Sequence, residues 1–374
     1  GARVALGQPA ATVAAGPEAL PAPEQLEAEG ARIGSISIHV GDVFDLDKPG
    51  ERKTVFRWAN TLHRDTRARV VARQLLFAEG EPYSASAIAE SERALRALRF
   101  LAEVSVRPVA YHDGLVDIEV RTRDNWSLKP GLNFGRSGGV NKYKIEIEES
   151  NFLGWGKNLQ LEHTSDVDRT STLFSYEDPN LFGSRLRGRI VYADSSDGTT
   201  EELRLEQPFF ALTTRRAGGF DLRDDRRTTD LYELGHVRES FEQKSRLGEV
   251  WFGLSRGLMH GETHRLILGV TYDEVQFAQL AEEPPTALPP DRTLVYPWVG
   301  WSWLQDRFVI EHDFDRVGRA EDLEMGWQGS ARLGVAAESF GSDRDAVVYE
   351  STLSRGFTPG DRQLLLASAT LGGR

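Results

Sequence analysis

The sequence predicts a mainly β fold, in which a small α+β domain with the element order β-α-α-β-β precedes an antiparallel transmembrane β-barrel. Two observations predict this fold. After Asn125, apolar and polar residues alternate over runs of about ten residues, as in strands with one apolar and one polar face. Three bulky residues that follow such runs, Phe152, Leu181 and Phe209, are 29 and 28 residues apart (181 − 152 and 209 − 181), about the length of one long hairpin.

Composition limits the classes of function. The chain has 374 residues, enough for two or three domains, and its net charge of −12 argues against a nucleic-acid partner, which would need clustered cations. The absence of cysteine removes disulfides and thiolate metal sites. No apolar run approaches the ~18 residues of a transmembrane helix. We expect no cofactor and no metal.

The first part of the chain predicts a linker and a small domain. Residues 1–32 are rich in Ala, Pro, Gly and Glu without apolar periodicity, which predicts a flexible linker. Residues 33–123 predict the β-α-α-β-β domain, with helices expected over Arg67–Phe77 and Ser84–Phe100, and Ser84 as a helix cap. The expected strands are Ile33–Phe44, Val104–Tyr111 and Leu115–Arg121.

Residues 124–374 predict the barrel, with about twelve to fourteen strands. Alternation alone also fits a water-soluble sandwich, but the length of the strands and their densely charged face favour a membrane barrel with a polar lumen. We expect Tyr143, Ile145, Ile147, Leu161, Ile190 and Tyr192 to face lipid, and Lys144, Glu146, Arg187 and Arg189 to face the lumen. Tyr296, Trp298, Trp301 and Trp303 form an aromatic cluster of the kind found at a bilayer interface.

Three runs resemble a known superfamily. Gln74–Val106 (QLLFAEGEPYSASAIAESERALRALRFLAEVSV) resembles a POTRA domain, the polypeptide-transport-associated module. Asn151–Leu159 (NFLGWGKNL) and Tyr176–Gly188 (YEDPNLFGSRLRG) resemble the first periplasmic turns of the bacterial surface antigen barrel in the same BamA/TamA-type superfamily of outer-membrane assembly factors.

The resemblance implies particular roles for residues. It implies periplasmic turns at Asn151, Gly154, Gly156, Asp178 and Pro179. Complete barrels of the family have sixteen strands, so the barrel is expected to be truncated before full closure. Ser354-Arg355-Gly356-Phe357 resembles the family's V-R-G-F/Y signature, which implies a loop that places Arg355, Gly356 and Phe357 in the lumen.

The resemblance also implies a function that is not enzymatic. The chain is expected in a Gram-negative outer membrane, with the POTRA-like domain in the periplasm, assisting the insertion or translocation of unfolded client polypeptides. Its expected partners are outer-membrane lipid, these clients and accessory assembly proteins. The edge strand expected to capture clients comprises Ala102, Glu103, Val104, Ser105 and Val106. Leu128, Gly131 and Gly135 lie in the first barrel strand, where the glycines would suit a seam that opens sideways.

A second class of function starts from other residues. Gly253-Leu-Ser255-Arg-Gly257 matches the G-x-S-x-G nucleophile elbow, which would make the chain a soluble serine hydrolase with Ser255 as nucleophile. This motif needs a helix after the serine, and the following residues predict a new strand. His260 and His264 flank Glu262, but their segment is not helical and does not match H-E-x-x-H, so a hairpin loop with surface histidines is favoured over a metal site.

Overall fold

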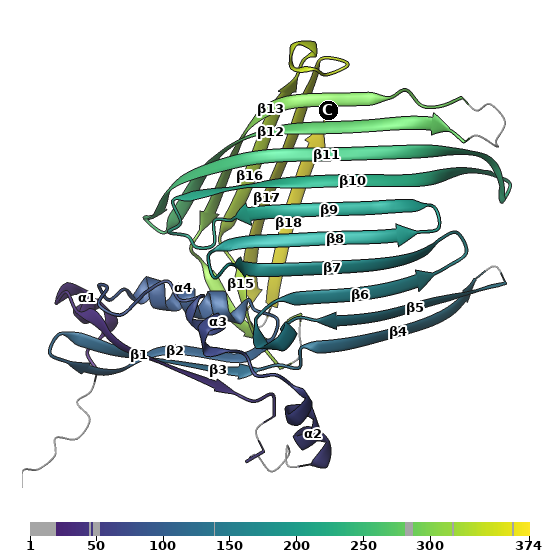
Figure 1. Cartoon of the computed structure of the whole chain (residues 1–374). Coiled ribbons are helices and arrows are strands. Elements are labelled where there is room, and N and C mark those ends of the chain that lie inside the picture. The colour runs from purple at the N-terminus through teal and green to yellow at the C-terminus, as the bar shows by residue number, and fades with distance from the viewer. Residues whose placement is uncertain are drawn as a thin grey trace, which may run out of the picture.

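The computed structural model describes residues 20–44, 46–47, 53–137, 139–280, 287–315, 318–360 and 363–374. The first 19 residues of the predicted linker lie outside this part of the chain. The described residues form a small α+β domain, from α1 to β3, and a large antiparallel sheet that begins at β4 (Figure 1). No described helix is long and apolar enough to cross a bilayer.

The small domain has a three-stranded sheet in the order β1-β3-β2, in which β1 is parallel and β2 antiparallel to the central strand β3. Ser84 caps α4 by accepting a hydrogen bond from the amide of Ala87, as the sequence predicts. The elements are α1 (Pro23–Ala28), β1 (Arg32–Gly41), α2 (Thr54–Leu62), α3 (Ala68–Ala72), α4 (Ala85–Arg96), β2 (Leu101–His112) and β3 (Leu115–Asp124).

Two helices of the small domain were not predicted. Helix α1 lies in the segment predicted as a linker, and that prediction is wrong there because Leu26 is only 1% exposed and packs into the same core as Ile33 and Val116. A helix of six residues is too short for its apolar residues to repeat at helical spacing, so the sequence pattern cannot reveal it. Leu26 is its one buried side chain. Helix α2 lies between β1 and α3, in a segment for which the sequence predicts no helix.

The large sheet confirms the prediction of a mainly β fold built on antiparallel strands. Thirteen strands follow one another in chain order, each antiparallel to its neighbours, and the two end strands, β4 and β18, do not pair with each other in the part of the chain that is described. The strands are β4 (Leu128–Ser137), β5 (Val140–Glu149), β6 (Asn158–Ser165), β7 (Thr170–Leu181), β8 (Leu186–Ser195), β9 (Gly198–Gln207), β10 (Arg216–Glu233), β11 (His236–Met259), β12 (Glu262–Gln279), β13 (Arg292–Gln305), β16 (Trp327–Ala336), β17 (Ala346–Gly360) and β18 (Gln363–Gly373).

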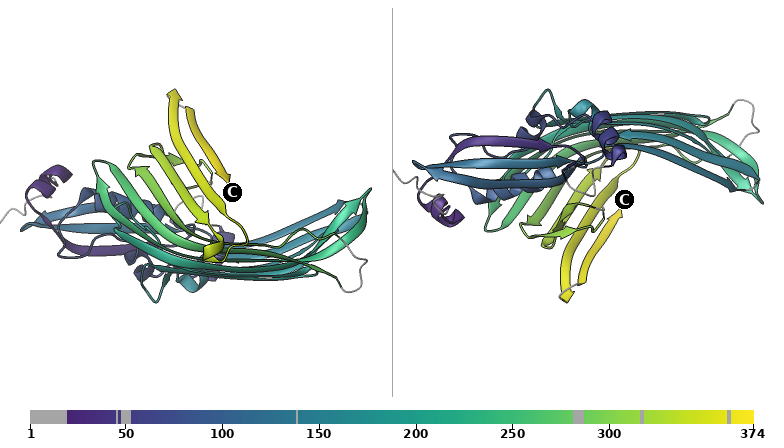
Figure 2. Two further views of the ribbon diagram at one scale, coloured as in Figure 1. Left: turned by 90° about the horizontal axis from the view of Figure 1, so that it is seen from above. Right: turned by 90° about the horizontal axis from the view of Figure 1, so that it is seen from below.

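The large sheet bends into an arc, and β16, β17 and β18 turn toward its concave side (Figure 2). A separate hairpin, β14 (Phe308–His312) and β15 (Ala320–Glu324), lies between β13 and β16 in the sequence but pairs only with itself. Strands β13 and β16 pair directly from Trp298 with Gly334 to Leu304 with Gln328, so the hairpin is an insertion at one end of the sheet.

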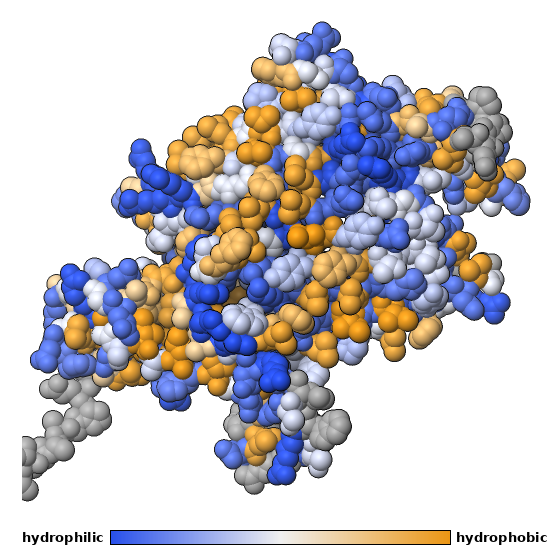
Figure 3. Space-filling view, in the orientation of Figure 1, coloured by the Kyte–Doolittle hydropathy of each residue, from blue (hydrophilic) through white to orange (hydrophobic). Residues whose placement is uncertain are grey.

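Alternation gives the large sheet two different faces. On the convex face, Ile145 and Ile147 remain 44% and 49% exposed, and Leu161, Ile190 and Tyr192 are also exposed. On the concave face, Lys144 forms ion pairs with Glu146 at 3.1 Å and with Glu162 at 2.9 Å. Apolar side chains gather over much of the convex face (Figure 3).

The aromatic cluster of β13 divides between the two faces. Tyr296 and Trp298 are buried, whereas Trp301 is exposed and stacks with Trp303 and His264. Because side chains alternate, residues three apart such as Trp298 and Trp301 face opposite ways, so the expectation of one interface cluster is wrong for half of its members.

Candidate functional site: the joint between the small domain and the strand ends

The turn between β5 and β6 is shaped by Asn151 and two glycines. The Asn151 side chain is buried, and its Oδ1 accepts a hydrogen bond from the amide of Gly156 at 2.7 Å. Gly154 and Gly156 have φ angles of +72° and +68°, which glycine adopts readily. Inside this turn, the 3₁₀ segment Phe152–Gly154 holds Leu153 at a φ of +54°.

This turn is the surface on which α3 docks. The Gly154 carbonyl accepts a hydrogen bond from the amide of Arg67 at 3.0 Å, and Asn151 Nδ2 donates to Thr66 Oγ1 at 2.8 Å. A Cβ on Gly154 would lie 2.2 Å from the carbonyl oxygen of Asp65, and one on Gly156 would lie 2.8 Å from Val70 Cγ1. The glycines are therefore needed for close approach as well as for turning the chain.

The next turn along the sheet, between β7 and β8, holds the residues that follow α3. Gln74 Nε2 donates to Asn180 Oδ1 at 2.7 Å, and Arg185 Nη2 donates to the carbonyl of Leu75 at 2.8 Å. Burial lowers the pKa of Arg185, so the Leu75 carbonyl accepts from a half-buried cation. The two segments singled out in the sequence, Asn151–Leu159 and Tyr176–Gly188, thus contain the two turns that contact α3 and the residues after it.

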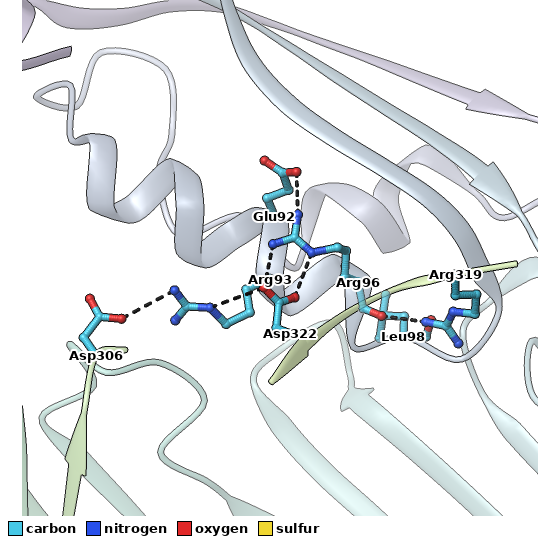
Figure 4. Close-up of polar contacts among 7 residues, drawn as sticks. All are labelled: Glu92, Arg93, Arg96, Leu98, Asp306, Arg319 and Asp322. Carbon is cyan, nitrogen blue, oxygen red and sulfur yellow. Dashed lines mark hydrogen bonds and ion pairs between the residues drawn. The ribbon is translucent and has the colours of Figure 1, made fainter. Parts of the chain in front are cut away.

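Helix α4 is held differently, through ion pairs with the β14–β15 hairpin (Figure 4). Arg96 Nε and Nη2 donate to the two carboxylate oxygens of Asp322 at 2.7 and 2.8 Å, and both side chains are only 9% exposed. Burial alone would lower the pKa of Arg96, but its bond to Asp322 and the charge of that carboxylate raise it. Arg93 pairs with Asp306 at 3.4 Å, and its guanidinium lies over the ring of Phe308.

The C-terminal end of α4 also receives a side chain from the hairpin. Arg319 donates to the carbonyls of Arg96, Leu98 and Arg99 at 2.6, 2.8 and 3.1 Å. The last carbonyls of a helix have no partner within it, and the helix dipole favours a cation there. Arg319 satisfies both requirements from outside the small domain (Figure 4).

One residue links α4 to a third connection of the large sheet. The Glu90 carboxylate accepts a hydrogen bond from the amide of Leu212, in the connection between β9 and β10. Burial raises the pKa of Glu90, and the bond from Leu212 opposes that rise. The small domain therefore contacts three successive connections of the sheet and the hairpin, all at the same end.

A cavity of about 390 Å³ lies where the small domain meets the concave face. Its lining combines the segment after α4, including Arg99, with charged concave residues that include Glu177, Arg187 and Arg189. Arg99 lies 3.8 Å from Glu148. Arg187 and Arg189, which the sequence predicts to face the lumen, thus line a cavity that the small domain closes on one side.

A buried histidine lies at the base of the joint. His63 Nε2 lies 2.8 Å from Asp124 Oδ2, which also accepts a hydrogen bond from the amide of Thr66 at 2.7 Å. Burial of His63 opposes protonation, but the bond and charge of Asp124, with Asp65 and Glu149 further away, raise its pKa. His63, Asp65 and Asp124 have ligand atoms within 4.8 Å of one another, the composition of a metal site, although the His63–Asp124 ion pair accounts for their closest contact.

The structure corrects several predicted positions. Asp178 and Pro179 lie in the last residues of β7 rather than in the following turn, whose tip is Phe182-Gly183, because β7 continues past an irregularity to Leu181. Arg355, Gly356 and Phe357 lie within β17 rather than in a loop, and Arg355 is over the rings of Trp327 and Phe357. Alternating residues on both sides of the motif continue the strand through it.

The nucleophile elbow predicted at Ser255 is not formed, which removes the basis for the hydrolase alternative. Ser255 lies within strand β11, and no helix follows it, so the strand-to-helix elbow is absent from this described segment. Its Oγ donates to the carbonyl of His264 at 2.8 Å and accepts from the amide of Gly257 at 3.0 Å. These bonds belong to a strand irregularity between β11 and β12.

The other predicted site residues lie on edge strands. Ala102, Glu103, Val104, Ser105 and Val106 are in β2, which has β3 as its one neighbour in the described three-stranded sheet. Leu128, Gly131 and Gly135 are in β4, an end strand of the large sheet. The sequence did not indicate the partners of α4, because Arg96 and Asp322 are 226 residues apart and neither lies in a recognisable motif.

Comparison with known proteins gives sequence and structural similarities, and no family model matches the chain. A Treponema pallidum (strain Nichols) protein described as an outer membrane protein assembly factor is 28% identical over 131 residues, which are 33% of this chain and 16% of that protein. The chain thus spans a small part of this relative.

The solved structures found by comparison cover most of the chain. BamA from Haemophilus ducreyi lacking POTRA domains 1–3 has 13% identity and a TM-score of 0.35, over 91% of this chain and 55% of that chain. CdiB from Acinetobacter baumannii has 12% identity and a TM-score of 0.45, over 92% and 53%. CdiB from Escherichia coli has 12% identity and a TM-score of 0.41, over 91% and 65%. The chain thus spans between 53% and 65% of the length of these structures.

Proposed function

We propose that this chain is an outer-membrane β-barrel protein that assists the assembly, insertion or translocation of client polypeptides, without enzymatic activity. Its POTRA-like small domain would lie in the periplasm of a Gram-negative bacterium. The observation that carries the proposal is the pair of unlike faces of the large sheet. The relative described as an assembly factor supports it.

The convex face is continuous across strand pairs. Ile147 faces Leu161, Leu161 faces Phe174 and Phe174 faces Tyr192, and all four side chains are exposed. A soluble protein rarely exposes contiguous apolar patches beyond a few hundred Å², so this face requires a cover. Lipid is the cover that needs no matching shape, and the charged concave face suits a water-filled interior.

A matched pair of substitutions tests this proposal. Ile145→Arg would place a charge on the lipid face, which costs on the order of 2–4 kcal/mol near the bilayer midplane. Glu146→Arg would place the same side chain on the concave face. We expect Ile145→Arg to impair insertion, measured by the difference in gel migration between boiled and unboiled samples, and Glu146→Arg to preserve it. Equal effects of the two substitutions would contradict the assignment of the faces.

Client capture would use strand β2. An edge strand has unpaired backbone N–H and C=O groups, so an extended polypeptide can add to it with little demand on its sequence. Release would occur sideways at β4, where Gly131 and Gly135 weaken the strand. Further proposed partners are outer-membrane lipid and accessory assembly proteins that would bring clients to the domain.

The capture step can be tested with single cysteines, because the chain has none of its own. Ser105→Cys on β2 and Ser37→Cys on β1 sample the two edges of the same sheet. We expect a peptide from an unfolded outer-membrane strand, carrying one cysteine, to crosslink to position 105 and much less to position 37. Ser105→Pro, which removes a backbone donor, should weaken crosslinking at neighbouring Glu103→Cys. Equal crosslinking at both edges, or no effect of the proline, would rule out capture at β2.

A further inference from the structure

Four arginines stand close together on and beside α3. Arg64, Arg67, Arg69 and Arg73 occur within ten residues of a chain whose net charge is −12. Among the described residues, none of these four side chains makes an ion pair or a hydrogen bond; Arg64, Arg67 and Arg69 are exposed and Arg73 is half-buried. Most other arginines near the joint do have acidic or carbonyl partners, as Arg96 and Arg185 do.

Two of the four are held in place by Trp155. The guanidinium carbons of Arg67 and Arg69 each lie 4.0 Å from the centre of the Trp155 ring. Stacking on a ring uses the flat face of a guanidinium and leaves the N–H groups at its edge available for an anion. The two cations are therefore ordered although no carboxylate in the described part of the chain pairs with them.

Apolar side chains accompany the arginines at the tips of two turns. Leu153, beside Trp155, is exposed with a φ of +54°. Phe182, in the next turn, is 93% exposed with a φ of +54°, and a Cβ on its neighbour Gly183 would lie 2.7 Å from Arg73 Nη2. A large apolar residue is unusual in this left-handed conformation, which glycine or asparagine adopts more readily.

The remaining arginine connects this surface to the convex face of the sheet. Arg64 lines a cavity of about 430 Å³ together with Leu153, Leu128, Ile147 and Leu159. Ile147 belongs to the apolar convex face described above. Near α3, hydrophilic side chains lie beside apolar side chains of the neighbouring strands (Figure 3).

We propose that Arg64, Arg67, Arg69 and Arg73, with Leu153 and Phe182, form a phospholipid-binding face that attaches the small domain to the surface of the adjoining leaflet. The arginines bind headgroup phosphates, most strongly in anionic phospholipids, and the two apolar side chains enter the boundary between headgroups and acyl chains. This inference rests on the proposed function, since it needs the convex face to be in lipid. A phospholipid matches both parts of this surface, because its phosphate suits the arginines and its acyl chains suit the adjoining apolar side chains. An acidic peptide would use only the arginines.

The test uses the whole chain in lipid nanodiscs, with one fluorophore on Ala72→Cys. Ala72 is exposed on α3 between Arg69 and Arg73. The discs contain phosphatidylcholine with a phosphatidylglycerol fraction raised from zero to roughly one third, and a lipid spin-labelled at its headgroup serves as quencher. We expect quenching to rise with phosphatidylglycerol. A basic residue near an anionic surface contributes about 1 kcal/mol, so removing two should weaken this attachment roughly thirty-fold.

Matched variants separate this surface from general charge. Arg67→Gln with Arg69→Gln should lose the phosphatidylglycerol dependence, whereas Arg107→Gln with Arg121→Gln, which removes two charges from β2 and β3, should keep it. Arg67→Lys with Arg69→Lys retains the charge and should also keep it. Equal quenching without and with phosphatidylglycerol, equal loss in both glutamine variants, or loss in the lysine variant would overturn the proposal.

A second label separates this inference from the proposed function. A fluorophore on Leu161→Cys reports the convex face, and it should be quenched by a lipid spin-labelled on its acyl chain. If position 161 is not quenched, the proposed membrane insertion fails and this inference fails with it. If position 161 is quenched but position 72 is not, only the phospholipid-binding face is wrong.

Discussion

The two sides of the small domain are attached to the large sheet by different kinds of contact. At α3, backbone amides and side chains, of which only Arg185 is charged, bond to two turns, and Gly154 and Gly156 allow the chains to touch. At α4, the contacts are ionic, led by Arg96 with Asp322 and supported by Arg93 and Arg319. The first attachment depends on shape and the second on charge.

This difference indicates a fixed side and a side that can be released. Close glycine contacts do not weaken in salt and cannot lengthen without losing their hydrogen bonds. The more exposed pair of Arg93 with Asp306 is screened by salt and can exchange its partner for water, whereas the nearly buried pair of Arg96 with Asp322 is screened less. We therefore expect the small domain to swing about the α3 attachment when the α4 attachment opens, which would uncover the cavity lined by Arg187 and Arg189.

The largest effect is expected from Gly154→Ala. The added Cβ would lie 2.2 Å from the Asp65 carbonyl oxygen, so the turn or α3 must move. We expect a loss on the order of 3–5 kcal/mol in the stability of the attachment. Gly261→Ala is the matched control, since its φ of +79° is similar but no atom lies within 4 Å of the added Cβ. It should cost about 1 kcal/mol. The rate of limited proteolysis in the α3 segment would measure the effect of each variant. Similar rates for Gly154→Ala and Gly261→Ala would show that the short distance between Gly154 and Asp65 is not what requires a glycine.

A somewhat smaller effect is expected from Asp322→Asn. Removing the charge leaves Arg96 nearly buried without its main partner, which costs on the order of 3 kcal/mol. The more exposed Asp306→Asn removes a partner of Arg93 and should cost less than about 1 kcal/mol. Hydrogen exchange of the α4 amides would give both opening free energies. If Asp306→Asn has the larger effect, Asp322 is not the main contact.

Raising the salt concentration should loosen the α4 attachment and leave the α3 attachment unchanged, without any change of sequence. Spin labels on Ala89→Cys and His312→Cys span α4 and the hairpin, and labels on Ala72→Cys and Phe182→Cys span α3 and its turn. Raising salt from about 0.05 to about 1 M shortens the Debye length to roughly 3 Å. We expect the distance distribution measured by electron paramagnetic resonance to broaden for the first pair only. Broadening of both pairs would show that the domain is released as a whole.

The smallest effect is expected from pH, through His63. Its pKa is raised above the ordinary 6.5 in the folded protein, so its protonated pair with Asp124 stabilises the fold fully below pH 6.5. That contribution is lost as the pH rises through the folded-state pKa. Hydrogen-exchange protection of the Thr66 amide, which bonds to Asp124, should fall over that interval. His63→Gln should remove the pH dependence, and protection that rises with pH would contradict this sign.

The sequence predicts what depends on local periodicity. Alternation identified the faces of residues such as Ile145 and Glu146, and glycine with asparagine marked the Asn151 turn. These features repeat every two residues or lie within one turn. The same local signals also identified the cap of α4 at Ser84, since capping involves residues three positions apart.

Contacts between distant segments could not be predicted in this way. The bond between Arg96 and Asp322 joins positions 226 residues apart, and the alternation of Ala320–Glu324 resembles that of any other strand. Leu26 is one apolar residue in a segment of otherwise linker-like composition, so only the folded core shows why it is helical. Conversely, Ser255 and Arg355 matched short motifs whose structural context is absent.

The β14–β15 hairpin is a modular part. Because it pairs only with itself, while β13 pairs directly with β16, the strand ladder of the large sheet does not depend on it. An insertion of this kind can be gained, lost or replaced during evolution without altering the number or register of the strands. Related chains could therefore differ in how firmly the small domain is fastened while keeping the same sheet, and a designer could exchange the hairpin for one with another charge pattern.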